Sequence, residues 1–188
     1  MIIAILSLFS SGCRRSGDVP RTEAASPRSA TTTDGCLTST APLPVTPLVI
    51  EWADEDRPRR LALDADGSVR DRDAVIARVS GRCIVNPRDA AIFRVDADRV
   101  IGSHQERVAV FQQRHALRVD DASVVVDEVL VSPDGSATAV DADGSIYLAP
   151  DDRPPFSLPG AIKGDVTRAR RTALLLWHLG HLADAVVR

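Results

Sequence analysis

The stretch "ATAVDADGSIYLA", residues 137–149, predicts a β-hairpin, because two short apolar runs flank a turn made of aspartate, alanine and glycine. Aspartate hydrogen-bonds its own backbone, and glycine adopts a positive φ, and tight turns demand both properties. Short apolar runs bounded by such residues are typical of strands. The stretch is therefore read as a strand, a tight turn and a second strand.

Related units recur along the body of the chain. An apolar residue, a DADGS-like turn and a second apolar residue occur at Leu63–Val69, Val95–Val100, Val119–Val124 and Val140–Ile146. Their aspartates are unequally spaced, whereas a solenoid or a propeller has a fixed period. Residues 48–158 are therefore predicted to form a mainly β domain, an antiparallel β-meander or a small β-roll of repeated hairpins.

The pattern changes period after the proline-rich stretch "PDDRPPFSLPG", residues 150–160. Residues 159–188 are predicted to form a linker and a C-terminal amphipathic helix, which Asp165 or Thr167 caps and which ends near Val187. At helical spacing, one side of it is apolar. That side carries Leu175, Leu176, Leu179, Leu182, Ala183 and Val186, and the opposite side carries Arg170, His178, His181 and Asp184. We expect the apolar side to pack on the sheet in an α+β domain, the alternatives being a membrane surface or a partner.

Three arginines, Arg168, Arg170 and Arg171, lie in the first turn of this helix. The helix dipole disfavours cations there by a few tenths of a kcal/mol each. We expect them to be solvated. Acidic turns of the β domain or lipid phosphates are the alternative partners.

His178, His181 and Asp184 recur every third residue on the same helix. A zinc site needs three or four converging ligands, and no other segment obviously supplies the rest. We therefore expect solvent-facing histidines and no metal or other cofactor.

The chain opens on an apolar run, Met1–Phe9 interrupted only by Ser7, which small residues connect to Cys13. This run is too short to span a bilayer as a helix. It resembles the signal peptide and lipobox of bacterial lipoproteins. The resemblance implies that residues 1–12 are a signal peptide and that Cys13 becomes an acylated N-terminus anchored in the membrane of the cell envelope. Arg14, where the family's retention signal has aspartate, implies the outer membrane.

Residues 13–47 are rich in Ser, Thr, Pro and Ala and contain few large apolar residues. Such a segment buries too little surface to offset its ordering entropy, so it is predicted to be a tether. Lipidation of Cys13 leaves two cysteines, Cys36 and Cys83, which either close a disulfide or remain as two thiols.

Composition excludes one large class of partner. The net charge is -3, and the sequence contains no basic stripe interleaved with aromatic residues, so we expect no nucleic acid to bind. The sequence also lacks the GxSxG, HExxH, GxGxxG and P-loop signatures. An EF-hand reading of the DADG segments fails, because Ile146 stands where the loop that begins at Asp141 requires glycine.

These observations predict a non-catalytic lipoprotein of the cell envelope that binds or scaffolds an envelope protein or polymer. The first alternative is a small extracytoplasmic hydrolase or metal-dependent enzyme, which a pocket containing His178, His181 and a carboxylate of the β domain would favour. The second alternative is a calcium-responsive surface protein.

Overall fold

The computed structural model describes residues 36, 41–54, 57–119, 122–152 and 154–187. The predicted signal peptide and Cys13 lie outside these residues. The described strands are β1 (Leu48–Asp54), β2 (Arg57–Leu63), β3 (Ser68–Asp71), β4 (Ala74–Ser80), β5 (Cys83–Val85), β6 (Ala91–Asp96), β7 (Arg99–Gly102), β8 (Arg107–Val119), β9 (Ala122–Val131), β10 (Ala137–Val140), β11 (Ile146–Ala149), β12 (Phe156–Leu158) and β13 (Ile162–Gly164), and the helix is α1 (Val166–Val187).

The predicted fold class is confirmed. The described strands form one antiparallel sheet of thirteen, in which β1 to β12 follow one another in chain order as a meander and β13 pairs with the free side of β1. Among the described residues, no helix combines the length and the apolar character that crossing a bilayer requires.

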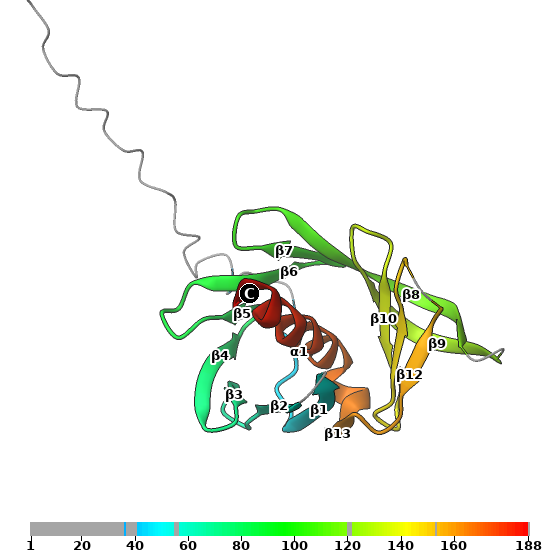
Figure 1. Cartoon of the computed structure of the whole chain (residues 1–188). Coiled ribbons are helices and arrows are strands. Elements are labelled where there is room, and N and C mark those ends of the chain that lie inside the picture. Colours follow the sequence, from blue (N-terminus) through cyan, green and yellow to red (C-terminus); the bar gives the residue numbers. More distant parts are fainter. Residues whose placement is uncertain (1–35, 37–40, 55–56, 120–121, 153, 188) are drawn as a thin grey trace, which may run out of the picture.

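The sheet curls around the helix, which lies on its concave face (Figure 1). From Thr172 to Gly180 every residue of α1 is buried except His178, which is half-buried. This differs from the predicted single apolar stripe and from the predicted solvent-facing position of His178. The physical reason is that a curled sheet contacts the helix on several sides, whereas a flat sheet would cover one side only.

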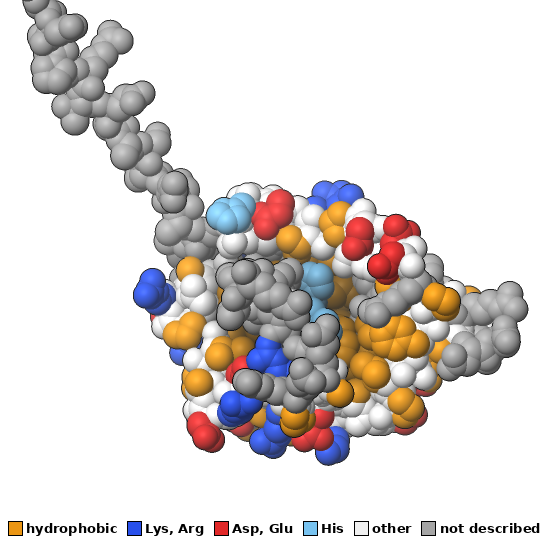
Figure 2. All heavy atoms as spheres, viewed as in Figure 1, with side chains coloured by type: hydrophobic (Ala, Val, Ile, Leu, Met, Phe, Trp, Pro, Cys, Tyr) orange, Lys and Arg blue, Asp and Glu red, His pale blue; other side chains and the backbone are white. Residues whose placement is uncertain are grey.

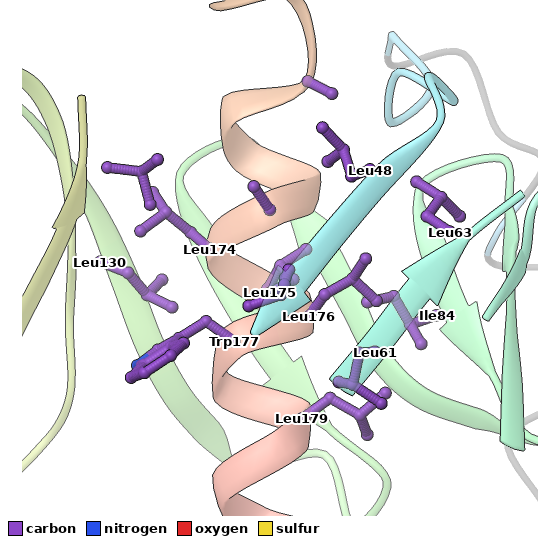
Figure 3. Packing of buried hydrophobic residues seen from close by; sticks show 14 of the residues in the cluster. Leu48, Leu61, Leu63, Ile84, Leu130, Leu174, Leu175, Leu176, Trp177 and Leu179 are labelled. Carbon is purple, nitrogen blue, oxygen red and sulfur yellow. The ribbon is translucent and has the colours of Figure 1, made fainter. Parts of the chain in front are cut away.

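The helix forms the centre of the main hydrophobic core (Figure 3). Leu174 and Trp177 point towards Leu130 of β9, whereas Leu176 points to the other side. The residues on that other side are Leu48, Leu61, Leu63 and Ile84. Each fully buried leucine contributes about 1.5–3 kcal/mol, so this short segment supplies much of the free energy that holds the sheet curled.

The DADGS-like segments after Leu63, Val95 and Val140 form tight turns, as predicted, whereas residues 120 and 121 of the Val119–Val124 unit lie outside the described residues. Between β10 and β11, Asp141 N donates to Ser145 O (2.9 Å), Gly144 N donates to Asp141 O (3.1 Å), and Ser145 N donates to Asp143 Oδ1 (2.8 Å). Gly144 has a φ of 84°. The same three bonds and a glycine with positive φ occur in the turns 64–68 and 132–136.

The two ends of the sheet meet at one of these turns. Ile162 N, in β13, donates to Gly144 O in the β10–β11 turn (2.9 Å). A Cβ at position 144 would lie 1.9 Å from Ile162 O, so only glycine allows the approach. The turn glycine thus has a second role, which is to let the curled sheet come back on itself.

The predicted tether ends earlier in the chain than residue 47. Cys36 is joined to Cys83 of β5 by a disulfide, with 5.4 Å between the Cα atoms. Leu43 is buried in the main core, and the carbonyl oxygen of Pro44 accepts a hydrogen bond from Thr172 Oγ1 (2.7 Å). Residues 41–47 are therefore part of the folded domain, because Leu43 provides a buried apolar anchor.

Arg171 fixes the first turns of α1 to the sheet. Its guanidinium donates to Glu128 Oε1 from Nη2 (2.6 Å) and Nε (2.8 Å), to Asp98 Oδ1 (2.8 Å) and to the carbonyl oxygen of Ala97 (3.1 Å). It also lies 4.7 Å from the centre of the Phe111 ring. Burial opposes the charge of Arg171, but the bonds to Glu128 and Asp98 hold its pKa above the ordinary value.

The expectation of solvated arginines is thus wrong for two of the three. Arg170 pairs with Asp127 of β9 (2.8 Å), and Arg171 is the paired residue just described. Both arginines are accommodated at the start of the helix because acidic residues of the sheet and its turns form ion pairs with them. The side chain of Arg168 is exposed. Its backbone N–H donates to Asp165 Oδ1 (3.1 Å), so Asp165, one of the two predicted capping residues, caps the helix.

Gly144→Ala should reduce the free energy of unfolding by at least about 2 kcal/mol, because it adds a clash with Ile162 O to the strain of a positive φ. Gly135→Ala is the matched control. Gly135 has the same turn position and a φ of 92°, but its Cβ would meet only Asp151 Oδ1, at 3.7 Å. The control should lose only about 1 kcal/mol in urea denaturation. Equal losses in the two variants would contradict the meeting of the sheet ends.

Arg171→Ala should cost about 3 kcal/mol, because it leaves Glu128 buried without its cation. Arg168→Ala removes the charge of an exposed arginine from the same helical turn. It should raise the free energy of unfolding by a few tenths of a kcal/mol, because the helix dipole disfavours a cation there. Thermal and urea denaturation of both variants measure the difference. An Arg171→Ala variant as stable as Arg168→Ala would show that the ion pairs do not hold the helix.

Candidate functional site

A cavity of about 600 Å³ opens where the curled sheet fails to close. Its volume lies in the range of about 300–1,000 Å³ that small-molecule sites occupy. It is lined by Trp52, Ala53, Ser132, Asp134, Ser136, Ala137, Thr138, Leu148, Pro150, Phe156, Leu158, Trp177, His178 and His181. We call it the seam cavity. Figure 2 shows histidine side chains beside a hydrophobic patch on this face.

The topology explains why the cavity lies there. β13 pairs with β1 only at Leu48–Ile50, so it does not extend along β1 to Trp52 and Ala53. β12 is the other end of the strand order, and Phe156 and Leu158 lie on it. The gap between these two sheet ends has α1 as its floor, which supplies the lining residues at 177, 178 and 181.

An aromatic cluster links the floor to β1. The Trp52 ring lies edge-on to Trp177, with 5.5 Å between centroids, and stacks on His181 at 5.6 Å. Gly180 makes room for this packing, because a Cβ at that position would lie 2.7 Å from the Trp52 ring. The imidazole of His181 is in turn 4.2 Å from Trp177. The cluster is therefore held from both the sheet and the helix.

The β9–β10 turn supplies a polar wall. Asp134 Oδ1 accepts hydrogen bonds from Ser136 N (3.0 Å) and Ser136 Oγ (2.7 Å), which lower the pKa of Asp134 below its ordinary 3.8. Asp134 therefore remains a carboxylate. Ser132 and Thr138 add two hydroxyl groups to the lining on either side of it.

His178 lies in the floor, half-buried, with its ring 5.6 Å from that of Phe93. Burial lowers the pKa of His178 below its ordinary 6.5, and the neighbouring His181 lowers it further, while Asp134 opposes both effects. His178 therefore presents a neutral imidazole to the cavity at pH 7.

His181 is exposed, and its Nδ1 lies 2.9 Å from the carbonyl oxygen of Trp177. A carbonyl oxygen can only accept, so Nδ1 carries a proton. The hydrogen bond to the preceding helical turn fixes the orientation of this imidazole.

The structure thus brings together His178 and His181, which the sequence had placed on the helix, with a carboxylate of the β domain, Asp134. The side chain of Asp184 lies outside the described residues. No group of three or more His, Cys, Asp and Glu side chains suited to a metal ion occurs in the part of the chain that the structure describes. The disulfide between Cys36 and Cys83 clusters with Val85 and Ala91 and does not line the cavity.

Sequence reasoning did not identify the site residues outside the helix. Trp52 and Thr138 were assigned to the sheet only, Phe156 was placed in the proline-rich stretch, and the aspartate of the β9–β10 turn was not distinguished from other turn aspartates. One signal was present: the chain has two tryptophans, Trp52 and Trp177, and both line this cavity.

Comparison with known proteins adds no relative, since no protein-family model, no curated protein and no solved structure matches the chain significantly.

The unfolding free energy should fall as the pH is lowered through 6.5, because the unfolded chain then binds a proton that the folded His178 resists. The contribution of His178 to stability is complete above the pKa that this histidine has in the unfolded chain. Below that pKa, the free energy of unfolding declines by at most about 1.4 kcal/mol per pH unit. His178→Gln should remove this part of the decline in urea denaturation between pH 7.5 and 5. His104→Gln, on the exposed β7–β8 turn, is the control and should retain it. A decline in His178→Gln as large as that of the wild type would contradict the burial of a neutral imidazole.

Proposed function

We propose that this protein is a non-catalytic lipoprotein of the cell envelope that is anchored in the outer membrane through an acylated Cys13. Its folded domain binds an envelope component, a protein or a polymer, in the seam cavity. The observation that carries the proposal is a cavity of about 600 Å³ between the sheet and α1, whose lining combines apolar and hydroxyl-bearing side chains. The lipobox-like stretch that ends at Cys13 supports the anchor.

The chemistry of the lining favours binding over catalysis. In the described part of the chain, no hydrogen bond joins His178 or His181 to a hydroxyl or carboxyl group, as a nucleophile and its base would require. The hydrogen bonds to Asp134 come from the adjacent Ser136 and stabilise the turn. His178 packs on Phe93, where burial keeps it neutral.

A hydrolase is the second candidate function, and one observation favours it. His178, His181 and Asp134 line the same cavity, so an imidazole and a carboxylate are both within reach of one bound molecule. Such an enzyme would use these groups as general acid and base. The two proposals differ in whether the bound molecule is released unchanged.

The anchor is tested by metabolic labelling with an alkyne fatty acid in a bacterial host, followed by intact-mass analysis. The wild type should carry the label and lose the mass of residues 1–12. Cys13→Ala should carry no label and retain the full mass, because acylation and processing both require the cysteine. A matched Ser11→Ala variant, which leaves Cys13 in place, should be labelled like the wild type. Equal labelling of wild type and Cys13→Ala, or none in either, would overturn the anchor.

A further inference from the structure

We infer that the seam cavity binds a neutral saccharide, an inference that rests on the proposed binding function and names the class of its ligand. It follows from three properties of the lining: the combination of apolar and hydroxyl-bearing side chains, the sign of the charge and the packing of the elements that support them.

The lining of the cavity combines the two kinds of side chain that match the two kinds of surface on a sugar ring. Apolar side chains come from β1, β11 and β12, among them Trp52, Leu148 and Phe156. Aromatic and aliphatic groups of this kind pack against the C–H faces of a pyranose. Thr138 of β10 is the cross-strand partner of Leu148, so its hydroxyl group and those of the β9–β10 turn lie beside the apolar surface and can bond the hydroxyl groups at the ring's edge. A purely apolar chain, such as an acyl group, would leave those hydroxyls and Asp134 without partners.

The charge of the described lining residues disfavours anionic ligands. Among these residues there is no lysine or arginine, and Asp134 is their one carboxylate. The lowered pKa values of Asp134 and of His178 keep the first charged and the second neutral at pH 7. A phosphate or carboxylate group would therefore meet the negative charge of Asp134, with no lysine or arginine among the described lining residues to compensate it. A neutral sugar avoids this repulsion and can donate a hydroxyl to the Asp134 carboxylate.

The supporting elements hold the lining groups in place before a ligand arrives. The floor is the buried part of α1, Trp52 is wedged against Gly180, and the polar wall is a hydrogen-bonded turn. Side chains that are already held in place lose little entropy when a ligand binds. This favours the affinity for a sugar, because most of its hydrogen bonds to the protein only replace hydrogen bonds to water.

The tryptophans make the test direct, because the chain contains two and both line the cavity. Tryptophan emission of the full folded chain is titrated with neutral trisaccharides: α-1,4-glucan, β-1,4-glucan and β-1,4-linked N-acetylglucosamine. Trigalacturonic acid serves as the anionic comparison. We expect a saturable change with at least one neutral trisaccharide and none with the acid.

A matched pair of variants locates the binding. Thr138→Val removes one hydroxyl from the cavity wall and preserves the shape, and it should weaken binding about fivefold to tenfold. Tyr147→Phe also removes one hydroxyl, but from the opposite face of the neighbouring strand β11, where Tyr147 packs against a hydrophobic cluster that includes Val129 and Ala139, and it should bind like the wild type. Equal affinity in the two variants would place the saccharide elsewhere and overturn the inference.

A neutral apolar dye, N-phenylnaphthylamine, separates failure of the inference from failure of the proposed function. Energy transfer from tryptophan to the dye, without a response to any neutral trisaccharide, overturns the saccharide inference and leaves a binding cavity. No response to either probe overturns both. Binding accompanied by shorter saccharide products supports the ligand class and replaces the non-catalytic proposal with the hydrolase.

Discussion

The structure depends on the burial of one helical segment, Thr172–Gly180, inside a single curled sheet. A meander has one apolar face that must be covered, and this domain has no second sheet in its described part. The C-terminal helix covers that face, and thirteen strands are enough to surround it almost completely. The same constraint explains the close approach of the sheet ends at Gly144 and Ile162, and the seam cavity that remains beside them.

Charge determines how the helix lies within the sheet. A row of leucines would allow rotation about the helix axis and sliding along it, because apolar packing is not directional. Arg171 bonds Glu128 and Asp98, and Thr172 bonds the carbonyl oxygen of Pro44, so the first turns have one position. Two turns further on, that position places His178 and His181 in the cavity floor. The ion pairs at one end of the helix therefore determine the chemistry of the site near its other end.

Local patterns were sufficient for the hairpins, the turn aspartates, the helix cap at Asp165 and the fold class, because neighbouring residues determine each of them. The curvature of the sheet was not predictable in this way, since it depends on packing between Trp52 and Gly180, which are far apart in the chain. For the same reason, the sequence suggested His178 as a solvent-facing residue and could not join it to Asp134. The pairing of Cys36 with Cys83 was left open, because spacing alone does not establish geometry.

The central claim is that helix and sheet are one cooperative unit, and native-state hydrogen exchange tests it most directly. The account predicts that amides in the middle of α1, in β1 and in β9 exchange with the same free energy, equal to that of global unfolding. It also predicts that this free energy falls by the same amount in all three elements when Leu175 is replaced by alanine, since all three pack in the core that contains it. Exchange of α1 at a distinctly lower free energy, with the sheet still protected, would show that the sheet curls without its helix and would contradict the account.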